Sequence, residues 1–209
     1  MIANYHTHSR WSVDARIPMA EMALAAAAQG LDEICFTDHL DYDPRGLMGI
    51  MSFETDVYNE EYDALEVPGL KIRRGMEFGM TPDNQAQLRQ DLQRRPFDFV
   101  LGSIHFADDL DVYFPEYWSD KTVFEAERRY LETTLQCLQI HDDFDVLAHL
   151  TYIAKAQSHP AHRPVPFTEH REIIDEILLE LIKNKKALEI NTAGLRKAIG
   201  VTSPDESIV

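Results

Sequence analysis

Histidine side chains follow short apolar runs at several points along the chain. His6 and His8 come directly after the run 2–5, and alternate residues of a strand face the same side, so both rings can face one point. Imidazole is the commonest metal ligand in proteins near neutral pH. Other ligand-type residues also stand at or just past the ends of apolar runs, which predicts one metal centre. Its expected ligands are His6, His8, Glu77, His105 and His149.

Asp14 and His39 are expected at the same centre. Asp14 lies in the loop after His8, and His39 closes the second apolar run. Both residue types are common metal ligands, so both are predicted to bind an ion. The neighbouring Asp38 is predicted to accept a hydrogen bond from a ligand histidine, an arrangement that orients imidazole rings in many metal sites.

Glu77 is the expected bridging ligand. It lies between Gly75 and Gly79, two residues that would let the backbone turn sharply while the side chain points at the centre. A carboxylate in this position could bridge two cations roughly 3.5–4 Å apart, the spacing of two-metal hydrolases.

Basic residues near the predicted centre could bind phosphate. Arg196 follows the last apolar run, and a guanidinium suits bidentate recognition of phosphate. Lys155 and Arg163 are predicted as further phosphate contacts. The remaining histidines lie off the strand ends and are predicted at the surface, although those at 159 and 162 stand in a loop that could fold over the site. They are His141, His159, His162 and His170.

Apolar runs and helical patterns alternate along the chain. The strand-like runs are 2–5, 33–37, 70–76, 97–103, 144–148 and 187–191, and the helical patterns cover 17–29, about 54–65, 84–94, 121–141 and 168–184. This alternation predicts a mostly parallel sheet. Ligands at the carboxyl ends of nearly every strand converge only if the strands form a ring, so we expect an α/β, TIM-like barrel in a single domain, 1–209. The segments 40–52 and 156–166 are predicted to be loops over its mouth.

Composition narrows the class of protein. The formal net charge of −16 argues against a nucleic-acid partner, since phosphate backbones need clustered Lys and Arg. No apolar run is long enough to cross a bilayer, so no membrane partner is expected. The two cysteines, Cys35 and Cys137, build no disulfide framework, which suits a reducing cytoplasm.

The motifs together resemble those of the PHP (polymerase and histidinol phosphatase) superfamily. They are His6-Thr7-His8-Ser9, Thr37-Asp38-His39, the glycine-flanked Glu77, Gly102-Ser103-Ile104-His105 and His149, and Asp14 with the stretch 189–196 is most similar to the histidinol-phosphatase branch. The resemblance implies a distorted (β/α)7 barrel with a trinuclear site, hence two or three divalent ions (Zn, Mn or Fe). It implies one ion at His6, His8 and Glu77, a second at Glu77, His105 and His149, and a third at Asp14 and His39.

The family's late Asp-x-His motif, on a seventh strand, is absent from these residues. The segment Ser203-Pro204-Asp205-Glu206 carries the signals of a helix start, namely a capping serine, a proline and two acids. With only six strand-like runs counted, we expect the seventh strand to be missing here and the domain to be incomplete at its C-terminal end.

The resemblance implies a phosphatase acting on a small phosphorylated metabolite, with L-histidinol phosphate as the first expectation. A metal-bound hydroxide would attack phosphorus, Arg196 would neutralise charge on the phosphoryl group, and His39 is a candidate proton donor. Two alternatives remain: a C–N hydrolase of the amidohydrolase type, which also uses His-x-His on a barrel, and a degenerate barrel that binds metal without catalysis.

Overall fold

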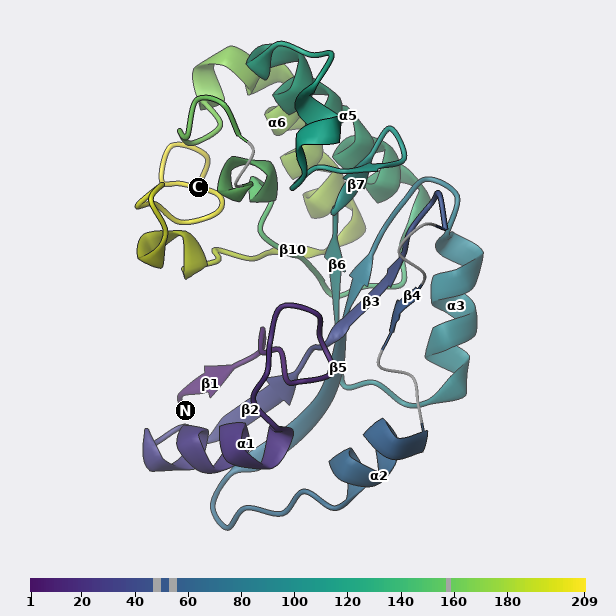
Figure 1. Cartoon of the computed structure of the whole chain (residues 1–209), viewed down its shortest axis with the longest axis vertical. Coiled ribbons are helices and arrows are strands. Elements are labelled where there is room, and N and C mark those ends of the chain that lie inside the picture. Colours follow the sequence, from purple (N-terminus) through teal and green to yellow (C-terminus); the bar gives the residue numbers. More distant parts are fainter. Residues whose placement is uncertain (47–49, 53–55, 157–158) are drawn as a thin grey trace. The chain divides into compact units, whose positions relative to one another are not determined.

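The structure is a computed structural model that describes residues 1–46, 50–52, 56–156 and 159–209. Its residues divide into two compact units, which we call unit 1 (Met1–Phe78 and Gln87–Leu101) and unit 2 (Gly79–Ala86 and Gly102–Val209). In chain order (Figure 1) the elements are β1 (Ala3–Asn4), α1 (Met19–Ala28), β2 (Glu33–Phe36), β3 (His39–Tyr42), β4 (Ile50–Ser52), α2 (Asp56–Asp63), β5 (Lys71–Gly79), α3 (Gln85–Arg94), β6 (Phe99–Ser103), β7 (Phe106–Ala107), β8 (Leu110–Asp111), α4 (Pro115–Trp118), α5 (Val123–Ile140), β9 (Val146–Leu147), the 3₁₀ turn η1 (Tyr152–Lys155), α6 (Phe167–Asn184), β10 (Ala187–Leu188) and the 3₁₀ turn η2 (Ala193–Arg196).

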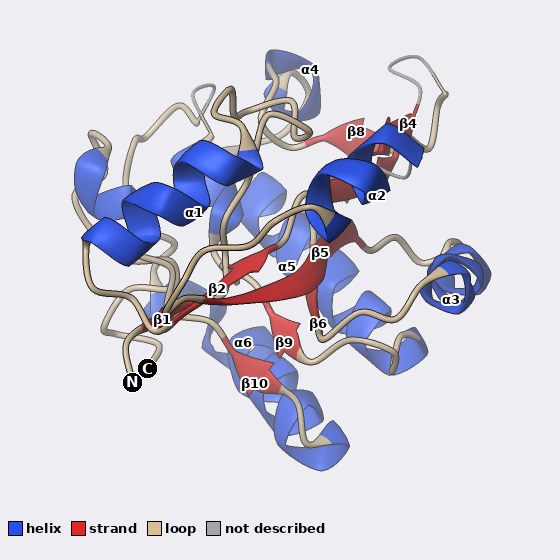
Figure 2. Cartoon of the chain, turned by 90° about the horizontal axis from the view of Figure 1, so that it is seen from below, coloured by secondary structure: helices blue, strands red, loops and turns tan. Residues whose placement is uncertain are grey.

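Unit 1 is built on parallel strands. β1 pairs with β2, and β2 pairs with β5. Beyond the end of β2, the chain continues into β3, which also pairs with β5 in parallel and sets His39 opposite Glu77. Helix α1 lies over β2 (Figure 2). All four residues of β2 are buried, as expected for a parallel strand that is covered on both faces.

Gly75 has a packing role in β5. A Cβ atom added there would lie 2.6 Å from the Cys35 sulfur and 2.9 Å from the Phe99 carbonyl oxygen, so only glycine lets these strands approach. The expected sharp turn around Glu77 is wrong, because β5 continues without interruption from Lys71 to Gly79. Glu77 therefore projects from inside a strand, where its position is set by pairing with His39 of β3.

Unit 2 combines a helix pair with short strands. Helices α5 and α6 lie side by side (Figure 1), and a capping box between Thr122 and Glu125 begins α5. β9 and β10 pair in parallel. The backbone N–H of Ala148 donates to the Gly102 carbonyl at 2.9 Å, which places the end of β9 beside the end of β6. β7 and β8 form an antiparallel hairpin.

Each of the six predicted apolar runs contains a strand, and each of the five predicted helical patterns contains a helix, in the expected order. The runs correspond to β1, β2, β5, β6, β9 and β10, and the patterns to α1, α2, α3, α5 and α6. Residues 54 and 55 of the second helical pattern lie outside the described residues. Short elements were missed, namely β3, β4, β7, β8, α4 and the two 3₁₀ turns, because so few residues carry little periodic signal.

The predicted loop 40–52 is partly wrong. Residues 40–42 belong to β3, which pairs with the antiparallel β4 as well as with β5, while residues 47–49 lie outside the description. The long strand β5 offers pairing partners that no local pattern reveals. The second predicted loop holds, since the described part of 156–166 contains no helix or strand.

The predicted helix start at Ser203 is also wrong. Ser203 instead forms an antiparallel bridge with Asn191, and its hydroxyl lies 3.1 Å from that of Thr151. Asp205 accepts the backbone N–H of Ser207 at 2.8 Å, which closes a turn. Asp205, two residues after the predicted capping residue Ser203, is thus the side chain that accepts a backbone N–H in this segment.

Three of the histidines predicted at the surface are buried, and only His162 among the four is exposed. His141 lies 2.8 Å from the Thr81 carbonyl oxygen through its Nε2 atom. His159 and His170 both contact the buried carboxylate of Glu127. The prediction failed because sequence position does not reveal such polar partners. Among the described helices, none has the length and apolar character needed to cross a membrane.

Candidate metal centre

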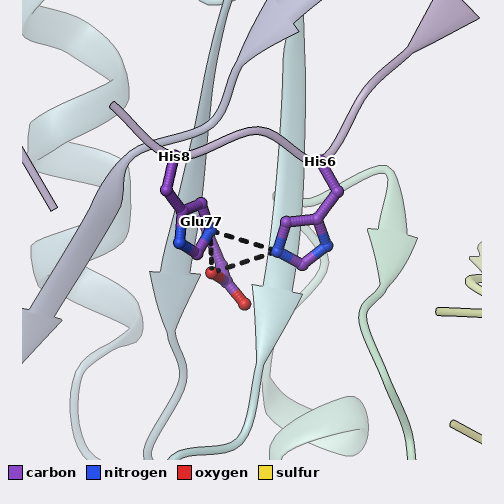
Figure 3. A group of neighbouring side chains, drawn as sticks. All are labelled: His6, His8 and Glu77. Atoms are coloured by element: carbon purple, nitrogen blue, oxygen red, sulfur yellow. Dashed lines mark hydrogen bonds and ion pairs between the residues drawn. The ribbon is translucent and has the colours of Figure 1, made fainter. Parts of the chain in front are cut away.

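His6, His8 and Glu77 point toward one another in unit 1 (Figure 3). The Nε2 atoms of the two histidines lie 3.2 Å apart. The Glu77 Oε2 atom lies 3.3 Å from His6 Nε2 and 2.9 Å from His8 Nε2, and the Glu77 side chain is fully buried. Two ring nitrogens and one carboxylate oxygen thus converge on one point. This donor set suits a divalent zinc, manganese or iron ion.

Hydrogen bonds to Thr37 fix the segment that carries His6 and His8. The backbone N–H of Thr7 donates to the Thr37 hydroxyl at 2.9 Å, and the Thr37 N–H donates to the Thr7 carbonyl at 2.9 Å. The chain therefore stays extended past β1. Both imidazoles consequently lie on the same side, as the spacing of the two histidines predicted.

A second group of ligand atoms lies beside the first. His8, Asp14 and His39 each offer one atom, and these atoms lie within 4.8 Å of one another. The His8 Nδ1 atom lies 3.0 Å from Asp14 Oδ1, and His39 Nε2 lies 3.8 Å from the same oxygen. The structure thus brings together all five site residues that the sequence predicted within unit 1.

The carboxylates control the charge of these histidines. Burial disfavours the charged form of His39, but the Glu77 charge and hydrogen bonds to Asp14 and Asp41 outweigh it and raise its pKa well above the ordinary value. Burial likewise opposes protonation of His8, while Asp14 and Glu77 raise its pKa. Burial would raise the pKa of Asp14, but its bonds to His39 and His8 hold it far below its usual range. The group is therefore built to hold positive charge.

Asp41 is a site residue that sequence reasoning missed. Its side chain is almost fully buried, and its Oδ2 atom lies 3.1 Å from His39 Nδ1. A signal was available, since Asp41 stands two residues after His39 in β3 and alternate strand residues face the same side. Asp41 orients the ring of His39.

Asp38 does not accept a hydrogen bond from a ligand histidine, so that prediction is corrected. Its carboxylate accepts the backbone N–H of Ser9 at 2.7 Å and the Ser12 hydroxyl at 2.8 Å. The Asp38 side chain thus binds the turn that separates His8 from Asp14.

Unit 2 brings His105 and His149 together. Both are buried, and their ring centroids lie 5.6 Å apart. The Tyr152 ring packs against both, 5.1 Å from His105 and 5.0 Å from His149. The His149 backbone N–H donates to Glu189 Oε2 at 2.8 Å, which fixes the backbone that carries this imidazole.

The three basic residues predicted to bind phosphate have different surroundings. Lys155 Nζ lies 5.4 Å from the centre of the Tyr152 ring, the ring that packs against His105 and His149. Arg196 is exposed in η2. The guanidinium of Arg163 lies 3.3 Å from a Glu127 oxygen and 3.4 Å from a Glu169 oxygen, and these carboxylates balance its charge.

Comparison with known proteins agrees with this geometry. The family model of the PHP domain matches residues 4–193. The chain is 35% identical over 193 residues to the histidinol-phosphatase of Lactococcus lactis, covering 90% of this chain and 71% of that protein. It is 31% identical over 198 residues to a "Probable histidinol-phosphatase" of Clostridium acetobutylicum, covering 94% of this chain and 75% of the other.

A solved structure shares the fold. The crystal structure of histidinol phosphate phosphatase from Lactococcus lactis, complexed with zinc, L-histidinol and phosphate, superposes with a TM-score of 0.81 at 35% identity, covering 91% of this chain and 73% of that one. This likeness confirms the predicted fold class, the TIM-like α/β class, and the parallel pairing of the strands in each unit agrees with it.

Proposed function

Because the chain belongs to the PHP domain family, we propose that it is a metal-dependent phosphatase that hydrolyses L-histidinol phosphate to L-histidinol and phosphate. The observation that carries this proposal is the convergence of His6, His8 and Glu77 on one point. The relatives at 35% and 31% identity, which carry histidinol-phosphatase names, support the substrate.

The residues of unit 1 would hold two ions. His6, His8 and Glu77 fit one ion, and Asp14 with His39 fits another. We propose His105 and His149 of unit 2 as ligands of a further ion, so the full complement is two or three ions of zinc, manganese or iron. When bound, such ions stabilise negative charge on the phosphoryl oxygens and favour attack by water on phosphorus.

Hydrolysis breaks the ester P–O bond, water adds to phosphorus, and the leaving alkoxide takes up a proton. His39 is our candidate donor of that proton, because its pKa is raised by Glu77, Asp14 and Asp41 against the effect of burial. A histidine that ligates an ion cannot donate a proton from the same nitrogen. The metal content of a His39→Gln variant separates the roles, since a lost ion indicates a ligand and retained ions with slow turnover indicate the acid.

Phosphate binding is assigned to cationic side chains. We propose Arg196 first, because it is exposed and follows the segment of Glu189 and Asn191, and a guanidinium can bind two phosphate oxygens at once. Lys155 contacts the Tyr152 ring that also packs against His149, and we propose that it supplies a second positive charge. Arg163 is the third candidate, through the N–H groups that do not face Glu127 and Glu169.

The test is release of inorganic phosphate from L-histidinol phosphate by protein loaded with Zn²⁺ or Mn²⁺. We expect turnover that is abolished by chelation and restored by adding the metal. A panel of cyclic amides tests the C–N hydrolase alternative in the same preparation. Failure of the metal-loaded protein to hydrolyse any phosphomonoester would overturn the proposal, and binding of metal without any turnover would favour a non-catalytic barrel.

Elemental analysis of the purified protein addresses the ions themselves. Mixed imidazole and carboxylate ligands suit zinc, manganese and iron alike, and the metal content identifies which ion the protein binds. We also propose a cytoplasmic location, because Cys35 and Cys137 are both buried free thiols, which fits a reducing compartment. Antibody detection after cell fractionation would test the location.

A further inference from the structure

One buried carboxylate next to the metal centre has only neutral hydrogen-bond donors as partners. Asp38 is completely buried. Its Oδ1 accepts the Ser9 N–H at 2.7 Å and the Ser12 hydroxyl at 2.8 Å, and its Oδ2 accepts the Ser9 hydroxyl at 2.9 Å. A buried charge is costly unless hydrogen bonds compensate it. The placement of Asp38 therefore depends on the serines that donate to it.

The donors to Asp38 belong to the turn that carries two metal-ligand candidates. Ser9 and Ser12 stand between His8 and Asp14, and the Ser12 N–H donates to the Ser9 carbonyl at 2.9 Å to close the turn. A carboxylate can only accept, so both serine hydroxyls donate to Asp38. Asp38 therefore sets where this turn lies against β2.

Asp38 is also linked by hydrogen bonds to the segments that carry His39 and Glu77. The Ser12 hydroxyl, which donates a hydrogen bond to Asp38, also accepts one from the backbone N–H of His39 at 3.0 Å. The Asp38 carbonyl oxygen accepts the backbone N–H of Glu77 at 3.1 Å. One residue thus links the segments of His8, His39 and Glu77 by a continuous path of hydrogen bonds.

We propose that Asp38 is the positioning residue of the metal centre, acting through Ser9 and Ser12 to hold His8, Asp14 and His39 at ligand distance from one another. Both carboxylate oxygens of Asp38 are occupied by donors, so it is not itself a ligand. The proposal rests on the proposed metal-dependent function. It extends that function to three residues, Asp38, Ser9 and Ser12, that are not among the proposed ligands.

The test compares metal affinity among variants. We would measure Zn²⁺ binding by competition with a chromophoric chelator, and the melting temperature of the metal-free protein in parallel. We expect Asp38→Ala to weaken Zn²⁺ binding about 10- to 100-fold, the usual effect of removing a group that supports metal ligands. Asp38→Asn keeps an oxygen for Ser9 N–H and Ser12, so it should recover most of the affinity.

Ser12→Ala is the milder variant and keeps the proposal testable if Asp38→Ala does not fold. It removes the link between Asp38 and His39 while leaving the carboxylate bonded to Ser9. We expect weaker Zn²⁺ binding with a nearly unchanged melting temperature. A role in stability alone would lower the melting temperature and leave the affinity of the folded protein as it was.

Asp91 is the matched control in unit 1. It is as buried as Asp38, and it bonds to Tyr42, Gln87 and Arg94, none of which belongs to the turn at 9–12. Asp91→Asn should lower the melting temperature and leave Zn²⁺ affinity unchanged. Wild-type affinity in both Asp38→Ala and Ser12→Ala would overturn the proposal alone, whereas a wild-type protein that binds no metal would overturn the proposed function with it.

Discussion

The Nδ1 atom of His8 lies 3.0 Å from Oδ1 of Asp14, and the opposite nitrogen of the same ring lies 2.9 Å from Glu77. Asp14 can only accept, so the Nδ1 proton of His8 points at Asp14. The Nε2 lone pair is then directed at the point shared by His6 and Glu77. Carboxylates commonly orient ligand histidines in this way and increase their basicity.

Removing the Asp14 charge should weaken the centre. We expect Asp14→Asn to reduce Zn²⁺ affinity at least about tenfold, because Asp14 both orients His8 and, with His39, is a proposed ligand of a second ion. Asp14→Ala should cost more, since His8 then loses its orienting partner. Equilibrium competition with a chelator measures both. Asp120→Asn, at an exposed carboxylate paired with Lys121, is the control, and equal effects in both positions would contradict this role of Asp14.

Glu77 should be indispensable for turnover. It is fully buried, and its Oε2 atom lies 3.3 Å from His6 and 3.3 Å from His39. Glu77→Gln keeps the shape but removes the negative charge, so we expect phosphate release to fall by on the order of 10²–10³. Steady-state rates with elemental analysis of the same sample measure the effect. Unchanged hydrolysis would remove Glu77 from the centre.

The stability of the metal-free protein should fall as pH rises. The folded-state pKa values of His8 and His39 are raised above the ordinary value of 6.5, so the folded state binds protons more tightly than the unfolded state. Their contribution is fully present below pH 6.5 and is lost as pH passes through the raised values. Urea denaturation with chelator, at a series of pH values, measures this trend.

Metal should reverse that pH dependence. An ion replaces the ring protons, so binding releases protons and strengthens as pH rises. The metal-loaded protein is therefore expected to gain stability over the same pH interval in which the metal-free protein loses it. Parallel trends in the two samples would contradict the assignment of His8 and His39 as ligands.

Glu127 should contribute to the stability of the fold and have no effect on Zn²⁺ affinity. His159 accepts two backbone N–H groups at its Nδ1 atom, so its Nε2–H donates to Glu127, and Arg163 lies where a cation would bind between Glu127 and Glu169. Glu127→Ala should lower the free energy of unfolding by about 1–3 kcal/mol, because the buried rings of His159 and His170 would each lose a hydrogen-bond partner. Urea denaturation measures it, and a simultaneous loss of Zn²⁺ affinity would contradict a structural role.

Gly75 should not tolerate a side chain. A Cβ atom would lie 2.8 Å from the Thr37 methyl group and 2.6 Å from the Cys35 sulfur. Gly75→Ala is expected to destabilise the protein by about 1–3 kcal/mol, the usual cost of overpacking. Because Thr37 also holds Thr7, metal affinity should fall too. Chemical denaturation and chelator competition give the two values, and a wild-type free energy of unfolding would refute the packing role.

Much of the metal centre could be predicted because the positions of its ligands depend on residues that are close together in the sequence. His6 and His8 are two residues apart at the end of a strand, and strand geometry alone then places both rings on one side. The long helices α5 and α6 could also be predicted, since their buried residues recur at helical spacing. Asp41 could have been found by the same alternation, because it follows His39 by two residues in β3.

The errors fall where a partner distant in sequence decides the outcome. Glu77 was expected in a turn, but β5 continues through it and pairs with β3 at this point. His159 and His170 were expected at the surface, but both are buried against Glu127, whose position relative to them no local pattern reveals. Ser203 bridges to Asn191 and does not start a helix.

The sequence by itself determined the ligand types, their placement near strand ends and the α/β alternation, because these depend on residue chemistry and on the periods of strand and helix. Only the tertiary structure decided which carboxylate contacts which histidine. Asp14 lies against His8 and Asp41 against His39, while Asp38 accepts hydrogen bonds from Ser9 and Ser12. That assignment depends on strand register and on a turn whose path is set by hydrogen bonds across some 26 to 29 residues of chain, contacts that only folding brings together.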